Sequence, residues 1–372
     1  MLPIALKSFR IKKYRGIIDT KLITIPDNTQ WIFLTGENGF GKTSILQGIA
    51  MGLINKKEKN ASFKCVSNTT NNQIPKPKNN KYVYEYMKQE LMNLNSIAAY
   101  GSTRLRVSSG TSLEVMKNSS PTSSLFSNDT LLINIEENFK DWKNNDPKSF
   151  NALENIFKTL LPQLHKIEVI FDKNEKRSKV KYYEKDVYGN VYNESIDFLD
   201  LAAGYKNIIA MIGDMINRLS FLVDLENLST LEGIVLIDEI DLHLHPKYQK
   251  LFVQKLTELF PKIQFIVSTH SPIPLLGAPA NSVIINVSRT REEGIKAELL
   301  DIDFSVLTPN AILSSPIFGF QDLIPESKTK DKMARSEDSY KEVLFNDLLD
   351  KQIDEYLTDE NKQELLDLLK IK

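Results

Sequence analysis

Apolar residues along the chain form short runs that alternate with longer stretches of helical spacing. The runs Trp31–Leu34, Ile234–Ile237 and Ile263–Ser268 have the length and composition of strands buried on both faces. Residues 44–51 and 246–260 instead place apolar side chains three or four positions apart, as amphipathic helices do. Strands and helices that alternate in this way predict an α/β fold built on a mostly parallel core sheet.

Other parts of the chain interrupt or flank this core. The first 25 residues predict two strands around a turn, which gives the fold an antiparallel β part. The stretch 55–95 predicts an insertion, mobile in its Asn-, Lys- and Thr-rich first half and helical at 81–94. The stretch 105–195 contains two helical patterns followed by alternating β patterns. It therefore predicts an inserted helical and β appendage.

The end of the chain differs in composition from the rest. We expect residues 1–320 to form one head domain, and residues 321–372 to form a charged linker followed by helices. Leu344 and Leu348 share one face of the first tail helix. Such helices either pack back on the head or bind a partner, and the pattern does not choose between them.

Composition narrows the class of protein. The chain has 372 residues, 41% of them hydrophobic and 26% charged, as in ordinary globular proteins. Its net charge of −1 provides no overall field toward nucleic acid or membranes. Cys65 is the only cysteine, which excludes an internal disulfide and a thiolate metal site. The opening residues have too short an apolar core for a secretion signal, so we expect a cytoplasmic protein without membrane segments.

One segment between a predicted strand and a predicted helix carries a complete phosphate-binding motif. It matches G-x-x-x-x-G-K-[ST] and is followed by Ser44. A Gly-rich turn brings backbone N–H groups close to a phosphate chain, and the following helix adds its positive end. We expect Lys42 to reach the terminal phosphates of ATP and the Thr43 hydroxyl to bind Mg²⁺. The alternative is a Gly-rich turn that binds nothing. The motif is Gly36-Glu37-Asn38-Gly39-Phe40-Gly41-Lys42-Thr43.

Two carboxylates follow the apolar run Ile234–Ile237. Asp238 at the end of a buried strand is suited to hold Mg²⁺, and Glu239 is suited to deprotonate the attacking water. The alternative is an acidic cap of the next helix. The phosphate-binding motif in the same chain, a P-loop, favours the first interpretation, in which Asp238 and Glu239 form a Walker B motif.

A histidine follows the next predicted strand, Ile263–Ser268. His270 would then lie beside the carboxylates, where a neutral imidazole can hydrogen-bond both the γ-phosphate and the attacking water. The alternative is a structural histidine.

The order of these motifs resembles that of the ABC-type ATPases. The closest likeness is to the SMC/RecF-like branch, which supplies ATPase components of DNA-repair and anti-phage defence systems such as Septu- or OLD-like ATPases. Residues 238–246 look like the Walker B motif and D-loop of that branch, and Tyr100–Arg104 takes the place of its Q-loop. The resemblance covers most of residues 1–290.

The resemblance implies an assembly as well as a fold. Leu201–Tyr205 takes the place of the signature motif, which contacts the nucleotide held by a second protomer. Ala203, Gly204 and Tyr205 would then bind ATP across a dimer interface, and Gly204 would allow close backbone approach. We therefore expect a dimer around two ATP molecules, with a separate effector protein and DNA as a possible further partner.

The sequence also departs from the family pattern. Ala203 stands where the signature usually has Ser, His245 stands where the D-loop usually has Asp, and no glutamine lies near Tyr100–Arg104. The insertion before the signature is too short for a long coiled coil. These departures keep a non-hydrolysing ATP-binding scaffold open as an alternative. A transporter motor is disfavoured because the sequence of residues 238–246 differs from the Walker B and D-loop sequence of transporter ATPases.

Two minor patterns have competing interpretations. His243 and His245 together with Glu239 suggest a metal site, although one short loop rarely supplies a full ligand set. The basic run between Lys173 and Lys181 either tracks a phosphate backbone or is a solvated hairpin, and the second interpretation is favoured.

Overall fold

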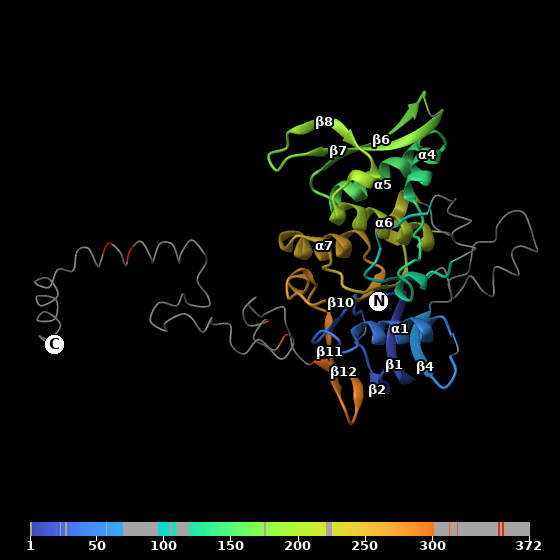
Figure 1. Ribbon diagram of the computed structural model, residues 1–372, viewed down its shortest axis with the longest axis vertical. Helices are drawn as coiled ribbons and strands as arrows, with labels where there is room; N and C mark the ends of the chain where they lie inside the picture. The colour runs from blue at the N-terminus through green and yellow to red at the C-terminus, as the bar shows by residue number, and fades with distance from the viewer. Residues whose placement is uncertain are drawn as a thin grey trace, which may run out of the picture. The chain divides into compact units, whose positions relative to one another are not determined.

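A computed structural model describes residues 2–300 apart from 23, 27, 57, 70–95, 105, 109–118, 175 and 221–224, and beyond them residues 312, 318, 349 and 352. The chain divides into two compact units, Met1–Gly319 and Phe320–Lys372. Both sheets belong to the first unit (Figure 1). The helices predicted at 81–94 and in the tail lie outside the described residues.

The main sheet has nine strands in the order β4-β1-β2-β12-β11-β3-β10-β9-β5. Five neighbouring strands are parallel: β11 (Val283–Thr290), β3 (Trp31–Thr35), β10 (Ile263–Ser268), β9 (Gly233–Ile237) and β5 (Ile97–Tyr100). Four strands add antiparallel pairings on one side: β4 (Ser62–Thr69), β1 (Ile4–Tyr14), β2 (Ile17–Leu22) and β12 (Gly294–Leu300). The predicted α/β fold with a parallel core and an antiparallel part is confirmed, and both parts belong to one sheet.

Successive residues of the parallel strands enter two different cores. On β3, Trp31 and Phe33 face one core, whereas Ile32 and Leu34 face the other. Side chains alternate across a strand, so a strand covered on both faces needs an unbroken apolar run. This double burial explains why the sequence pattern identified these strands.

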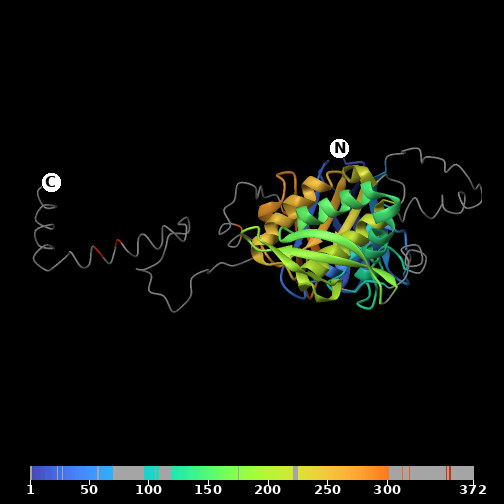
Figure 2. The ribbon, with the colours of Figure 1, turned by 90° about the horizontal axis from the view of Figure 1, so that it is seen from above.

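Helices cover both faces of the sheet (Figures 1 and 2). Residues of α1 join the core that contains Ile32, and residues of α4 to α7 join the core that contains Trp31. The α-helices are α1 (Lys42–Leu53), α4 (Ile135–Asn145), α5 (Pro147–Leu160), α6 (Ala203–Leu219) and α7 (Pro246–Leu259). Short 3₁₀ turns are η1 (Ser123–Leu125), η2 (Phe198–Asp200), η3 (Leu225–Thr230) and η4 (Pro274–Gly277).

The inserted appendage is a three-stranded antiparallel sheet backed by α4 and α5. Its buried side chains include Val180 and Tyr182, and the Tyr182 hydroxyl donates to Glu136 of α4 over 3.2 Å. Within the basic run, Lys179 pairs with an aspartate of β6 and Lys181 pairs with one beyond β8. These pairings favour the solvated hairpin. The strands are β6 (Leu164–Asp172), β7 (Arg177–Lys185) and β8 (Val191–Ile196).

The expectation of a mobile insertion is wrong for Ser62–Thr69. This segment is β4, which pairs antiparallel with β1 at the edge of the main sheet. Phe63 and Cys65 pack on the core that contains α1, and the Cys65 thiol donates to the carbonyl of Ile49 at 3.6 Å. Burial raises the pKa of this thiol to about 12. The polar composition of β4 is typical of an edge strand with one solvent-exposed face.

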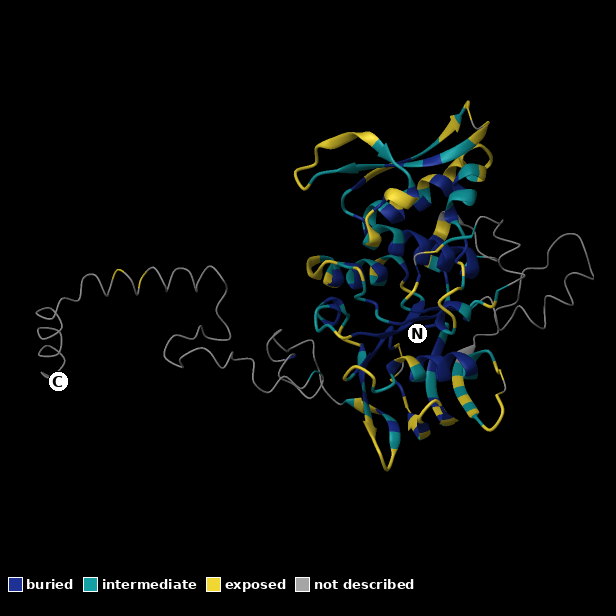
Figure 3. Cartoon of the chain, in the orientation of Figure 1, coloured by how far each residue is buried: buried dark blue, intermediate teal, exposed yellow. Residues whose placement is uncertain are grey.

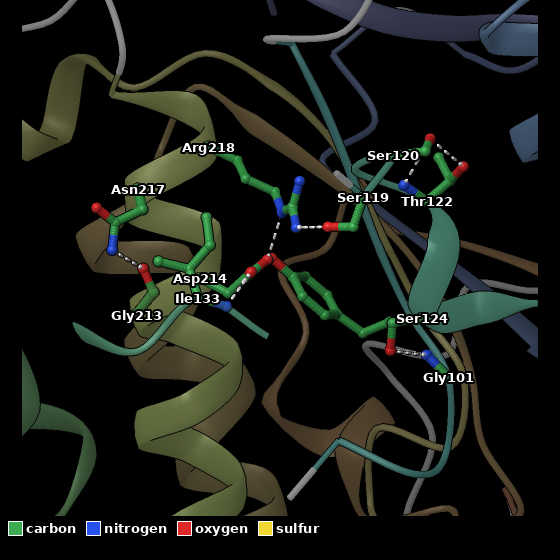
Figure 4. A network of polar contacts seen from close by, with 11 residues as sticks. Gly101, Ser119, Ser120, Thr122, Ser124, Ile133, Gly213, Asp214, Asn217 and Arg218 are labelled. Carbon is green, nitrogen blue, oxygen red and sulfur yellow. Dashed lines mark hydrogen bonds and ion pairs between the residues drawn. The ribbon is translucent and has the colours of Figure 1, made fainter. Parts of the chain in front are cut away.

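A buried carboxylate of α6 is bonded to the parallel part of the sheet. Asp214 is wholly buried and accepts from Arg218 over 2.7 Å and from the backbone N–H of Ile133 over 2.8 Å (Figure 4). It also accepts from the Tyr100 hydroxyl at the end of β5 over 2.9 Å. A buried carboxylate needs such partners, since an unpaired one would be costly. The contacts fix the helix that begins at the predicted signature motif.

Candidate functional site

The P-loop leaves β3 and enters α1 through three glycines in the left-handed region. Their φ angles are 133° at Gly36, 80° at Gly39 and 98° at Gly41. A Cβ atom at Gly36 would lie 2.2 Å from the carbonyl oxygen of Val287, and one at Gly41 would lie 2.4 Å from the Ile295 side chain. The loop therefore follows a path that side chains rarely adopt, pressed against β11 and β12.

Lys42 begins α1 and is almost fully buried. Its ammonium donates to the carbonyls of Gly36 at 2.7 Å and Glu37 at 3.0 Å, so the loop folds around its own lysine. Burial lowers the pKa of Lys42, and nearby carboxylates, Asp238 foremost, oppose that shift. A buried cation beside the loop carbonyls is suited to hold a phosphate chain.

The start of α1 has no side-chain cap. Its first N–H groups are therefore available to an anion, as a phosphate site requires. Among the other predicted loop residues, Glu37 and Asn38 are exposed, whereas Phe40 and Ser44 are half-buried. The whole motif thus has the geometry of a nucleotide-binding loop.

The Walker B aspartate lies against the P-loop threonine. The Thr43 hydroxyl donates to one carboxylate oxygen of Asp238 at 2.7 Å, and the Ser268 hydroxyl donates to the other at 2.5 Å. Asp238 is buried at the end of β9, between β5 and β10. A hydroxyl and a carboxylate side by side are the oxygen donors that Mg²⁺ prefers, so these residues fit the predicted ion.

Glu239 has an unusual backbone. Its φ is 50°, a left-handed conformation that costs a non-glycine residue roughly 1–2 kcal/mol. Its N–H donates to the Ser268 hydroxyl at 2.8 Å, and the next N–H, of Ile240, donates to the Ser268 carbonyl at 3.0 Å. Half-buried and strained residues of this kind often belong to functional sites. The turn directs the chain away from the strand immediately after Asp238.

His270 follows β10 and is exposed. Partial burial of the ring lowers its pKa, and the positive charge of Lys42 lowers it further. The imidazole is therefore mainly neutral at pH 7, the form that both donates and accepts hydrogen bonds. Because the parallel strands end at one edge of the sheet, His270, Asp238 and the P-loop are brought together as predicted.

The predicted signature segment lies at the start of α6. Ala203 is exposed, and the helix has no side-chain cap. Gly204 makes a close approach, but to its own chain: a Cβ there would lie 2.7 Å from the His243 carbonyl oxygen. The Tyr205 hydroxyl accepts from the backbone N–H of Gln163 at 3.2 Å. Contacts within the chain therefore already require glycine at position 204, and the approach of a partner's nucleotide to Gly204 stays a prediction.

His245, between β9 and α7, has a structural role at the start of α7. The His245 side chain caps α7 by accepting from the N–H of Lys247 at 3.3 Å, a role that the usual Asp can also perform. His243 is exposed with φ of 64°. Within the described residues, no group of three His, Cys, Asp or Glu side chains is arranged to hold a metal ion.

Comparisons with known proteins agree with this geometry. The family model described as an AAA ATPase domain matches residues 95–273, a segment that begins after the P-loop. The Septu protein PtuA of Bacillus mycoides (strain KBAB4) is 29% identical over 86% of this chain and 46% of its own. The retron Vc95 probable ATPase of Vibrio cholerae is 33% identical over 49% of this chain and 32% of its own. This chain thus spans less than half the length of either relative.

A solved structure shows the same fold. The SMC head bound to the C-winged helix domain of ScpA aligns with a TM-score of 0.51 and 15% identity, over 80% of this chain and 98% of that one. This chain therefore has the fold of an SMC head, and residues 95–273 match the AAA ATPase domain model. Among the described residues, no helix is long and apolar enough to cross a membrane.

Sequence reasoning missed one central residue of this site. Arg104, in the segment that takes the place of the Q-loop, is 1% exposed. Its guanidinium donates to the carbonyls of Asp238 at 2.6 Å and Glu239 at 2.7 Å. A charged side chain soon after an apolar strand was the available signal, but its carbonyl partners are 134 and 135 positions away. No sequence pattern identifies such partners.

Proposed function

We propose that this ATPase binds ATP and Mg²⁺, hydrolyses ATP in a dimer that encloses two nucleotides, and acts as the switch subunit of an anti-phage defence assembly. The observation that carries the proposal is the convergence of Lys42, the Thr43–Asp238 pair and Glu239 at one edge of the sheet. Each of these groups serves a separate step of phosphoryl transfer to water.

The P-loop residues bind and orient the substrate. The uncapped start of α1 offers N–H donors, and the Lys42 ammonium adds a positive charge for the terminal phosphates. Thr43 and Asp238 would hold Mg²⁺, which neutralises phosphate charge when bound. Ser268 keeps the Asp238 carboxylate oriented through its 2.5 Å hydrogen bond.

Glu239 acts on the attacking water. Its carboxylate accepts the proton of the water while the water oxygen attacks the γ-phosphorus, and ADP leaves with the bridging oxygen. Neutral His270 donates a hydrogen bond to the phosphate side of the reaction. The products are ADP, phosphate and one proton.

The dimer follows from the resemblance to ABC-type ATPases. The exposed, uncapped start of α6 at Ala203 is the part of the predicted signature segment that a partner's nucleotide can reach. The relatives named as Septu protein and retron ATPase support a defence setting with a separate effector. A cytoplasmic location accords with that setting, and DNA is a candidate trigger.

The substitution Glu239→Gln tests the hydrolysis step. The amide cannot accept the proton of water, so turnover should fall by about 10²–10⁴-fold while ATP binding persists. Steady-state phosphate release and equilibrium binding of a labelled ATP analogue measure the two effects. Glu258→Gln on the exposed face of α7 is the matched control and should retain both. Unchanged turnover in Glu239→Gln would remove Glu239 as the base, and binding without turnover in the wild type would favour the scaffold function.

The substitution Ala203→Glu tests the shared site, since Gly204 is unsuitable for that purpose. A carboxylate at this exposed position should repel the γ-phosphate held by the partner, and thereby abolish ATP-dependent dimerisation and turnover but not nucleotide binding. Light scattering and phosphate release are the measurements. Mixing Ala203→Glu with Lys42→Ala creates heterodimers with one intact composite site, so part of the activity should return. Wild-type turnover in Ala203→Glu alone would contradict the shared site.

A further inference from the structure

The segment that follows Asp238 is held by its backbone. Buried side chains from three separate elements donate to its carbonyls. Arg104 donates to residues 238 and 239, Asn207 of α6 donates to Leu242 at 3.1 Å, and Gln249 of α7 donates to Leu244 at 3.1 Å. Buried carbonyls require partners, and side chains supply them because no regular secondary structure follows β9 here. The position of Glu239 therefore depends on these three side chains.

Arg104 has a geometry that other residues cannot reproduce. Its NH1 donates to the carbonyls of Asp238 and Gly101, its NH2 donates to the carbonyl of Glu239, and its Nε donates to Asn207 Oδ1, all within 2.6–2.7 Å. A planar guanidinium has N–H donors in fixed directions, whereas an ammonium has three donors at one point. One guanidinium thus ties the end of β5, the end of β9 and α6 together.

The hydrogen bond to Glu239 lies where the backbone is strained. The left-handed turn at Glu239 has its N–H held by Ser268 and its carbonyl held by Arg104. Without Arg104, the carbonyl would lose its buried partner and the residue could relax to a conformation with negative φ. Such a rotation would redirect the carboxylate.

Asn207 extends this link to the start of α6. Its Oδ1 accepts from Arg104 and its Nδ2 donates to the carbonyl of Leu242, so one amide links Arg104 to the segment after Glu239. It lies one helical turn after Ala203. A displacement of the start of α6 would therefore reach Glu239 through two hydrogen bonds.

We propose that Arg104 is a positioning residue, which holds Glu239 in the conformation required for hydrolysis and couples it through Asn207 to the start of α6. This proposal rests on the proposed function, in which Glu239 is the base. The proposed substrate-binding groups have other partners than Arg104: Lys42 donates to the carbonyls of Gly36 and Glu37, and Thr43 donates to the Asp238 carboxylate. Loss of Arg104 should therefore affect the chemical step more than nucleotide binding.

The test compares Arg104→Met with Arg104→Lys in the full-length protein. Single-turnover hydrolysis with excess enzyme isolates the chemical step, and a labelled ATP analogue reports binding. Arg104→Met should slow hydrolysis by about 10²-fold, a loss similar to that of a general base, with KM and analogue affinity nearly unchanged. Arg104→Lys should have an intermediate hydrolysis rate, because lysine keeps the positive charge but lacks the planar guanidinium with its N–H donors in fixed directions. Asn207→Leu, which removes the link from Arg104 to α6 and the hydrogen bond to Leu242 but keeps Arg104, should cost about 10-fold.

Arg218→Met is the matched control. Arg218 is similarly buried and charged, but its guanidinium donates to Asp214 and Ser119 (Figure 4). This variant should lower the thermal midpoint and leave the hydrolysis rate of the folded fraction near that of the wild type. If Arg104→Met fails to fold, Arg104→Lys decides the question through the same separation of rate from binding.

The outcomes separate the two proposals. A slow chemical step with retained binding in the Arg104 variants, absent in Arg218→Met, supports the positioning role. Wild-type rates in the Arg104 variants, or equal losses of rate and binding, overturn it even when Glu239→Gln is inactive. If Glu239→Gln hydrolyses ATP normally, Glu239 is not the base, and Arg104 then has no positioning role in hydrolysis.

Discussion

The two sheets of this protein differ in how they are covered. In the main sheet, β3, β9 and β10 are buried along their whole length, with helices on both faces. In the appendage, β8 is exposed over its first four residues, and Phe171 and Tyr188 are 64% and 88% exposed (Figure 3). The central strands of the main sheet thus lie in the core, whereas much of the appendage sheet faces solvent.

This difference indicates what each sheet is suited to do. A strand fixed on both faces holds the residue at its end to a narrow range of positions, which the proposed hydrolysis requires of Asp238 and Glu239. The appendage packs one face on α4 and α5 and leaves the other in water. Changes there should leave the site intact, so matched substitutions in the two sheets provide direct tests.

The largest difference should come from removing a lysine in each sheet region. Lys42→Ala deletes the main positive charge for the terminal phosphates and should abolish nucleotide binding. Lys173→Ala, in the exposed turn between β6 and β7, should bind as the wild type does. Equilibrium binding of a labelled ATP analogue measures both. Wild-type affinity in Lys42→Ala would contradict the P-loop assignment.

A smaller difference should come from removing a phenylalanine ring in each sheet. Phe265 of β10 is wholly buried and stacks on Trp31 with ring centroids 4.5 Å apart. Phe265→Ala should lower the free energy of unfolding by about 3–5 kcal/mol. Phe171→Ala in β6 should change it by no more than about 0.5 kcal/mol. Urea denaturation followed by circular dichroism measures both, and equal losses would show that the appendage is also a packed core.

The smallest effect concerns the charge state of His270. Its pKa is lowered by partial burial and by Lys42, so Lys42→Ala should move that pKa back toward the ordinary 6.5, whereas Lys173→Ala should not. NMR titration of the imidazole measures the shift. Because the folded pKa lies below the unfolded one, the stability linked to His270 is present above pH 6.5 and is lost as the pH falls through the folded value. An unchanged pKa in Lys42→Ala would place the two groups far apart.

Much of the parallel core was predictable from the sequence. The limits of β10 at Ile263 and Ser268 and the start of α7 at Pro246 agree with the pattern of apolar runs and breakers. Burial on both faces produces an unbroken apolar run, and proline fits only the first turn of a helix. The P-loop and Walker B residues could be found because each occupies a fixed place beside such a run.

Elements with one solvent-exposed face were harder to predict. The segment that forms β4 is polar at alternate positions and resembles an insertion, and β8 has too few buried residues to show a pattern. Arg104 could be seen only as a charge after a strand, because its partners are backbone carbonyls brought close by the fold. Gly204 was attributed to a partner's nucleotide, whereas its neighbour is the carbonyl of His243.

The inert thiol in β4 gives this protein a practical advantage for measuring motion. Cys65 is the only cysteine, and with a pKa of about 12 it is almost entirely protonated at neutral pH, where thiol-directed dyes react with thiolates. A cysteine introduced at exposed Tyr188 would therefore accept a fluorophore selectively in the native protein. Energy transfer between two protomers of the proposed dimer, labelled in this way, would follow its opening and closing in real time, without first removing a native residue.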